Sequence, residues 1–229
     1  MKKAFTLAEV LITLGIIGVV AAMTMPTLIN SYKKQETVTK LRKIYSVLSQ
    51  AVQKAAPEAD YYSIPFADGS NEGMLSWYDE VIAPNIKVLK KCVYEEGCWN
   101  DGTKLLNGDT PIYDMGKKGI GGNNVTFDTP DGYFVTVDVW EASNVTSTLG
   151  VSTEAQAVVL YVDINGKTRP NLVGKDVFTL VYTVERGLMP AGKDLSNENV
   201  KANCAPNNSG MFCLEHLIRE GWNIKNTNI

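Results

Sequence analysis

An unbroken apolar run near the start of the chain limits how this protein can fold. From Phe5 to Met25 the only ionisable side chain is Glu9. At about 1.5 Å per residue, a helix made of this run is roughly 30 Å long, which matches the hydrocarbon core of a bilayer. The run therefore predicts a membrane-spanning helix over residues 5–28.

Glu9 stands inside this run, where a charge is unfavourable. A charged side chain in a membrane helix costs on the order of 2.5 to 3.5 kcal/mol, and such residues are candidates for function. An ordinary secretory signal peptide is the alternative, because Lys2 and Lys3 form a basic start and Ala22 offers a cleavage position. The run is longer than the apolar part of a signal peptide needs to be, which favours a retained helix.

Several residues in and around the run have characteristic positions when they are counted from Phe5. The stretch KKAFTLAEVLITLGIIGVV has a short basic leader, a small residue before Phe5, and Glu9 at the fifth position counted from Phe5. Gly18 follows within the run, and Pro26 comes just after it. This pattern resembles the N-terminal signal of type IV pilins and type II secretion pseudopilins. It departs from the family in having Ala4 before the cut, where glycine is usual.

The resemblance implies how the N-terminus is processed and used. A prepilin peptidase is expected to remove the leader, residues 1–4, by cutting between Ala4 and Phe5, and Phe5 is expected to be N-methylated. Glu9 is then an assembly residue that faces the ammonium group of Phe5 on a neighbouring subunit, so that two costly charges become a pair. Gly18 and Pro26 are expected to form a helix hinge.

A second helical pattern follows the apolar run. Over residues 29–56 apolar side chains recur at steps of three and four, which predicts an amphipathic continuation of the helix that packs on a sheet. Pro26 leaves two readings open: one long helix with a weak point, or two helices with a break between them. The apolar stripe consists of Val38, Leu41, Ile44, Tyr45, Leu48, Val52 and Ala55.

The rest of the chain, residues 57–229, reads as a globular head. Alternating patterns predict a hairpin over residues 124–140 that turns at Pro130–Gly132, then strands over residues 156–164 and 176–185. We expect an antiparallel sheet of about three or four strands that packs on the helix stripe. The fold class is therefore α+β, with a long N-terminal helix on an antiparallel sheet, a pilin-like layout.

Two parts of the head are expected to be less regular. Residues 58–124 predict an irregular connection with short helical pieces. Within it, the tract MGKKGIGGNN lacks the G-x-G-x-x-G spacing of a nucleotide loop and predicts a flexible loop. Near the C-terminus a short helix is expected over residues 212–220, ended by Gly221.

The cysteines form two close pairs, Cys92 with Cys98 and Cys204 with Cys213. These spacings suit small disulfide loops and differ from the C-x-x-C of zinc sites. The alternative is a set of free thiols in a reducing compartment. Pairing downstream of an export-like segment favours disulfides and an exported head.

The segment VDINGKTRPNLVGKDVF between two predicted strands contains the candidate metal ligands. Asp163, Asn165 and Asp176 supply oxygen atoms of the kind that Ca²⁺ prefers. The resemblance also suggests calcium, because calcium is known in the sheet-end loop of the major pseudopilin class. The alternative, which we favour, is that Asn165-Gly166 simply forms a turn. No other cofactor is expected.

Composition and motifs exclude other classes of function. A formal net charge of −3 gives no basic surface of the kind that nucleic-acid binding requires. The one histidine, His216, has no nucleophile motif or second imidazole near it, and no carboxylate pair stands out, so we expect no enzyme.

The expected function is that of a structural subunit in a membrane-rooted helical filament, either a type II secretion pseudopilin or a type IV pilin. Its partners would be prepilin peptidase, other subunits and an inner-membrane assembly platform. It would cross the bacterial inner membrane once, with the head in the periplasm or outside the cell. The alternatives are a minor, adhesive tip pilin and a secreted domain with an ordinary signal peptide.

Overall fold

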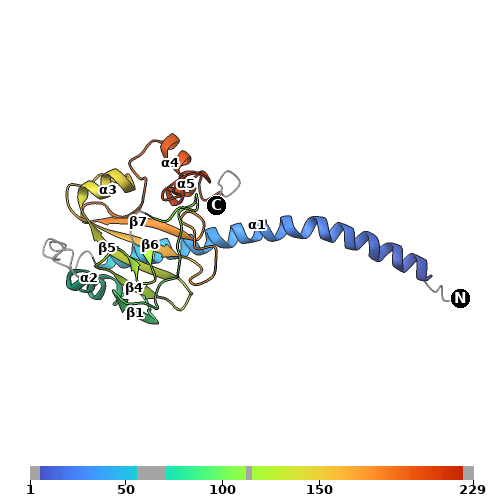
Figure 1. The fold of residues 1–229 in the computed structure, drawn as a ribbon, viewed down its shortest axis with the longest axis horizontal. Helices are drawn as coiled ribbons and strands as arrows, with labels where there is room; N and C mark the ends of the chain where they lie inside the picture. Colours follow the sequence, from blue (N-terminus) through green and yellow to red (C-terminus); the bar gives the residue numbers. More distant parts are fainter. Residues whose placement is uncertain (1–5, 56–70, 112–114, 224–229) are drawn as a thin grey trace.

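The protein has the shape of a rod with a head at one end (Figure 1). We describe it from a computed structural model, in which residues 6–55, 71–111 and 115–223 are described. Helix α1 (Leu7–Ala55) forms the rod, and its second half runs across the head. Its 49 residues correspond to roughly 74 Å at about 1.5 Å per residue.

Helix α1 is continuous through Pro26, so the reading of one long helix is correct. Only its second half is buried, and the buried positions repeat at helical spacing from Val38 onward, as the apolar stripe predicts. The helix curves gently along its exposed half (Figure 1). The hinge role of Gly18 and Pro26 stays a prediction.

The head is built on an antiparallel sheet of six strands in the order β1-β4-β5-β6-β7-β8. The α+β, pilin-like fold class is therefore confirmed. The strands are β1 (Lys90–Val93), β4 (Val125–Asp128), β5 (Phe134–Trp140), β6 (Ala157–Asp163), β7 (Val177–Thr183) and β8 (Gly187–Pro190).

The expectation of three or four strands is wrong because it misses both edges of the sheet. Strand β1 pairs with β4 and strand β8 pairs with β7, and each has four residues. Neither KKCV nor GLMP alternates clearly, and Pro190 is tolerated only because it lies on an edge strand. Lysines and proline at sheet edges also discourage pairing with other chains.

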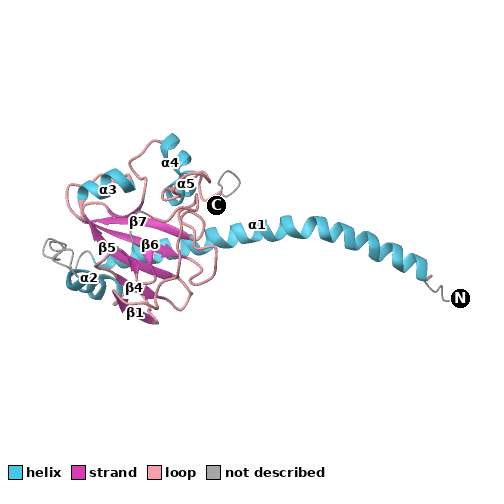
Figure 2. Ribbon diagram, in the orientation of Figure 1, coloured by secondary structure: helices cyan, strands magenta, loops and turns pink. Residues whose placement is uncertain are grey.

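Both faces of the sheet are covered (Figure 2). On one face Val137, Leu160 and Leu180 belong to the core formed with α1. On the other, Val159 and Tyr161 belong to a second core, to which helix α3 (Ala142–Leu149) contributes. Strands β6 and β7 are buried at every position for this reason, which explains their nearly continuous apolar sequence.

The region predicted as an irregular connection contains more structure than expected. Helix α2 (Asn71–Trp77) runs into a π-helical turn, η2 (Tyr78–Ile82), which packs on α1. The glycine-rich tract is not a flexible loop, because it forms a hairpin of β2 (Met115–Gly116) and β3 (Gly119–Ile120). Ile120 is fully buried, and a side chain at Gly119 would collide with two threonine hydroxyls of the sheet.

Two helices follow the sheet at the C-terminal end. Helix α4 (Asn197–Asn203) was not predicted; Ser196 caps its start by accepting a hydrogen bond from the N–H of Asn199. Helix α5 (Cys213–Arg219) corresponds to the predicted C-terminal helix, and Gly221 follows it with a positive φ of 66°.

Candidate functional site

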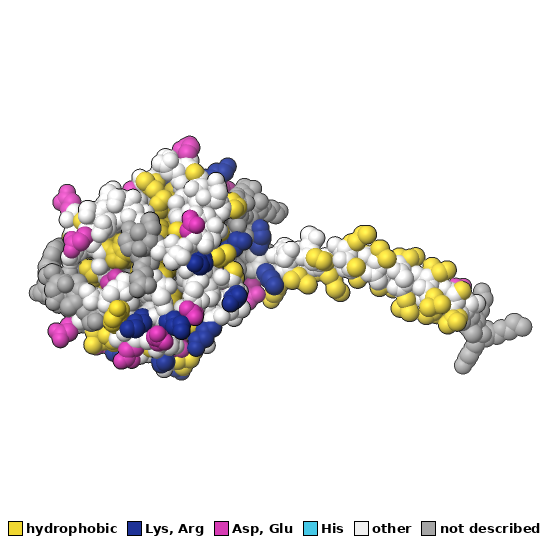
Figure 3. Space-filling model, viewed as in Figure 1, with side chains coloured by type: hydrophobic (Ala, Val, Ile, Leu, Met, Phe, Trp, Pro, Cys, Tyr) yellow, Lys and Arg dark blue, Asp and Glu magenta, His cyan; other side chains and the backbone are white. Residues whose placement is uncertain are grey.

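The exposed half of α1 is the first feature that points to function. Its large apolar side chains have no cover from the head, and Leu7 is 78% exposed. Yellow side chains cover most of this half in Figure 3, up to the dark-blue side chains where the helix meets the head. Within the described residues, α1 is the one helix that is long and apolar enough to cross a membrane. Such a surface requires a bilayer or other helices around it.

Thr6 and Glu9 form a capping box at the start of α1. The N–H and hydroxyl of Thr6 donate to Glu9 Oε2 at 2.8 and 2.7 Å, and the N–H of Glu9 donates to Thr6 Oγ1 at 3.3 Å. The spacing T-x-x-E signals this cap, and our sequence reasoning missed it. Glu9 thus has a local role at the tip of the helix, besides the predicted assembly role. Ala4 and Phe5 lie outside the described residues.

Gly18 and Pro26 lie in the exposed half of α1, away from the head. A Cβ atom added at Gly18 would meet nothing within 4 Å, so packing within the chain does not require glycine there. The reason for Gly18 must be sought in helix flexibility or in contacts with other molecules.

Both predicted disulfides are present. Cys92–Cys98 closes a loop that begins within β1, with Cα atoms 5.9 Å apart. Cys204–Cys213 joins the end of α4 to the start of α5, with Cα atoms 4.9 Å apart. The described residues include no free cysteine.

The predicted metal ligands lie close together at the two ends of the long β6–β7 loop, residues 164–176. Asp163 is the last residue of β6, and Asn165 and Asp176 belong to the loop. Asp176 accepts hydrogen bonds from the backbone N–H groups of Leu172 and Asn171 at 2.6 and 2.8 Å, and from the Asn165 amide at 3.1 Å. Asp163 accepts one from the backbone N–H of Asn165 at 2.9 Å. The two carboxylates therefore hold the loop in shape by binding N–H groups.

Burial makes these carboxylates unusual. It raises the pKa of Asp163 to about 7, with the nearby charge of Asp176 as a further cause, and it also raises the pKa of Asp176. The described residues contain no group of three or more His, Cys, Asp or Glu side chains that could hold a metal. Two buried amide oxygens nearby, Oδ1 of Asn165 and of Asn171, have no hydrogen-bond partner. Calcium binding stays a prediction.

The predicted turn at Asn165-Gly166 forms, but it does not by itself join β6 to β7. The N–H of Thr168 does bond to the Asn165 carbonyl, so a local turn forms, and Gly166 has a positive φ of 62°. The chain then continues through residues 169–176 before β7 begins. The predicted strands, which end at residue 164 and begin again at residue 176, already leave room for a long connection, and the structure confirms one of nearly the same length.

The β6–β7 loop and the end of β6 are held by residues 99–104, which follow the first disulfide and are called here the first disulfide segment. The Asn100 amide donates to Asp163 Oδ2 at 2.5 Å and accepts from the Thr103 hydroxyl at 2.6 Å. Lys104 exchanges backbone hydrogen bonds with Asn171 and Val173.

The second disulfide loop packs against the same β6–β7 loop. Gly174 has a φ of 87°, and a Cβ atom there would lie 2.8 Å from Cys213 Sγ and 2.9 Å from the Gly210 carbonyl. The glycine is required for this close approach. The residues that follow the first disulfide and the loop closed by the second therefore both meet the loop that the sequence singled out for metal binding.

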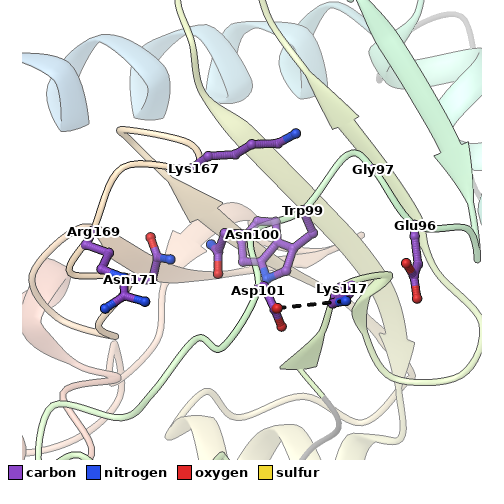
Figure 4. A pocket seen from close by; sticks show the side chains of 9 residues that line it. All are labelled: Glu96, Gly97, Trp99, Asn100, Asp101, Lys117, Lys167, Arg169 and Asn171. Carbon is purple, nitrogen blue, oxygen red and sulfur yellow. Dashed lines mark ion pairs between the residues drawn. The ribbon is translucent and has the colours of Figure 1, made fainter.

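A pocket of about 480 Å³ lies between the first disulfide segment and the β6–β7 loop (Figure 4). Lys117 and Asp101 form an ion pair of 3.9 Å at its wall. Acidic and basic side chains both face it, so its charge favours no single kind of ligand. Its lining consists of Glu96, Gly97, Trp99, Asn100, Asp101, Lys117, Lys167, Arg169 and Asn171.

An exposed apolar helix on an α+β head defines the class: the architecture is pilin-like and fits a membrane-anchored protein. Comparison with protein families makes the class more specific. Residues 1–25 match the prokaryotic N-terminal methylation motif, which is typical of type IV pilins and type II secretion pseudopilins. The motif implies processing by prepilin peptidase. No curated protein and no solved structure matches the chain.

Proposed function

We propose that the protein is a structural subunit of a membrane-rooted helical filament, either a type II secretion pseudopilin or a type IV pilin. It is cut before Phe5 by prepilin peptidase, waits in the inner membrane with its head outside the cytoplasm, and enters the filament through α1. Its role is mechanical and not enzymatic. An inner-membrane platform and other subunits are its partners.

One observation carries this proposal: the methylation motif lies on a helix half that projects from the head with its apolar side chains exposed. A cleaved signal peptide would remove residues up to about Ala22, yet α1 continues without a break into the head. In a filament, neighbouring helices cover the apolar half that the head leaves bare.

The start of the mature protein tests this proposal. We expect N-terminal sequencing of the protein from membranes of its own host to begin at Phe5, with N-methylation seen by mass spectrometry. The cut depends on prepilin peptidase, so a host strain lacking that enzyme should keep Met1. A mature start at Met23 would show an ordinary signal peptide and overturn the proposal.

The assembly role of Glu9 can be separated from its capping role. Glu9→Gln keeps a side-chain oxygen that accepts from the Thr6 N–H but removes the charge that would pair with the Phe5 ammonium. If the charge drives assembly, the variant should reach the membrane at normal levels and enter filaments at least tenfold less, measured by cross-linking of sheared fibres.

Thr6→Ala serves as the matched control, because it removes the capping hydroxyl and leaves the Glu9 charge. We expect it to assemble better than Glu9→Gln. Assembly of Glu9→Gln at the wild-type rate would mean that Glu9 serves only as a helix cap.

A further inference from the structure

A groove between α1 and the β6–β7 loop is lined by thirteen residues, of which five are basic and two are acidic. It has a volume of about 560 Å³. Helix α1 contributes Lys33, Lys34 and Lys40, and the loop contributes Arg169 and Lys175. Figure 3 shows dark-blue side chains gathered where α1 leaves the head.

Most of these cations have no acidic partner. Lys40 pairs with Glu36 at 2.9 Å. The other acidic residue of the groove, Asp176, is buried and already accepts hydrogen bonds from the loop. Within the described part of the chain, Lys33, Lys34, Arg169 and Lys175 form no ion pair, and all are exposed. Exposed like charges repel one another weakly in water, and an anion bound between them would relieve this repulsion.

The groove opens at the level of the lipid headgroups. Lys33 comes five residues after position 28, where the predicted span ends, which is about 7.5 Å along a helix. The headgroup region of a bilayer extends roughly 5–7 Å beyond the hydrocarbon core on each side. The backbone of Lys33 and Lys34 therefore lies at the outer edge of the headgroup layer, and their long side chains can reach back to the phosphate groups. The loop residues line the other side of the groove.

The side of the membrane makes this basic cluster unusual. Lysine and arginine are normally enriched in the cytoplasmic flanks of membrane helices. Under the proposed function, on which this inference rests, the groove lies on the opposite side. After removal of the leader with Lys2 and Lys3, the exported flank of α1 is more basic than the cytoplasmic one. Membrane topology does not account for these residues, so a ligand on the exported side is the better explanation.

We propose that this groove binds anionic phospholipid headgroups of the membrane into which α1 inserts. Lysine ammonium groups and the arginine guanidinium donate hydrogen bonds to phosphate oxygens, and basic residues near an anionic bilayer are attracted to it. The contact holds the head down on the membrane while the subunit waits for assembly. Entry into a filament then requires release of these lipids.

Lysine labelling of the full chain in lipid nanodiscs tests the proposal. One set of discs contains phosphatidylcholine alone and the other contains phosphatidylcholine with one quarter phosphatidylglycerol, at one copy of the chain per disc. We expect acetylation of Lys33, Lys34 and Lys175 to be roughly threefold slower or more in the anionic discs. Lys54, Lys87 and Lys201, which are exposed outside the groove, should react equally in both.

Three further labelling conditions distinguish bound lipid from other ligands of the groove. If inorganic phosphate at 20 mM protects the same lysines in phosphatidylcholine discs, the ligand is free phosphate and the lipid proposal is overturned. If protection appears in those discs only with two copies per disc, the groove binds a second chain, which also overturns it. Sodium chloride at 0.5 M should remove protection in the anionic discs, because the attraction is screened.

A set of variants completes the test. Lys33→Gln, Lys34→Gln and Lys175→Gln combined should retain several-fold fewer phosphatidylglycerol molecules than wild type in native mass spectrometry. The matched set Lys54→Gln, Lys87→Gln and Lys201→Gln should retain as many as wild type, with both sets folded by circular dichroism. Equal labelling in the two kinds of disc would overturn this inference alone, whereas failure of the chain to enter discs would also contradict the proposed function.

Discussion

At the scale of single residues, Asp138 is the least expected feature of the head. It lies on β5 opposite Val159, on the face of the sheet away from α1, and only 7% of it is exposed. Its Oδ1 accepts a hydrogen bond from the Val139 N–H at 2.8 Å. Burial raises the pKa of Asp138 to about 7. The folded protein therefore prefers this carboxyl in its protonated, neutral form.

The sign of the pH effect follows from the direction of this shift. In the unfolded chain an aspartate has its ordinary pKa near 3.8, so folding binds the proton more tightly. The stabilisation is fully present below pH 4 and is lost as the pH rises through about 7. Asp163, whose pKa is also raised to about 7, acts in the same direction. The free energy of unfolding should therefore fall between pH 4 and pH 7.

Asp138→Asn should reduce this fall in the free energy of unfolding as the pH rises. Asparagine keeps an oxygen for the Val139 N–H and carries no charge, so we expect the variant to be more stable than wild type at pH 8, by on the order of 2 kcal/mol. At pH 4 the two should be nearly equal. Urea unfolding followed by circular dichroism at both pH values measures the difference.

Glu154→Gln is the matched control, because Glu154 is exposed and its loss of charge should leave the pH profile unchanged. A wild-type pH profile in Asp138→Asn would show that this carboxyl is charged in the folded protein.

At the scale of elements, the predictions succeeded where one pattern runs over many residues. The apolar run and the stripe from Val38 onward predict α1 because both repeat over several turns. The central strands also carry enough apolar residues to be recognised. The short edge strands and the β2–β3 hairpin were missed because pairing partners, and not their own residues, make them strands.

At the candidate site, the β6–β7 loop also has contacts that the sequence pattern does not predict. Its residues attracted attention as possible calcium ligands, and they do lie close together. The sequence did not reveal that residues after the first disulfide and the loop of the second disulfide contact this loop, or that α1 forms a groove with it. These contacts join residues far apart in the chain, and their spacing in sequence contains no sign of them.

At the scale of the whole molecule, the head and the exposed half of α1 are separate in their packing. Large apolar side chains from Leu7 to Tyr32 are exposed, and Val38 is the first buried residue of the helix. The head therefore owes its stability to the second half of α1 and not to the first.

Removing the exposed half should leave the head folded. We expect a chain that begins at Asn30 to be soluble without detergent and to melt within about 2 °C of the full chain in detergent micelles. A chain that begins at Lys43 should be much less stable, because it lacks Val38 and Leu41; loss of a buried leucine alone costs roughly 2–5 kcal/mol. Thermal melts followed by circular dichroism compare the three chains. Loss of folding in the chain that begins at Asn30 would show that the exposed half of α1 supports the head.

The sequence by itself determined the apolar helix, its processing motif, the α+β class and the pairing of nearby cysteines. Each of these depends on residues close together in the chain, where periodicity, charge and short spacing act directly. Only the tertiary structure decided the six-stranded order, the buried carboxyls and the basic groove between α1 and the β6–β7 loop. These arise where packing brings distant segments together, and burial, charge and cavity shape are properties of that packing.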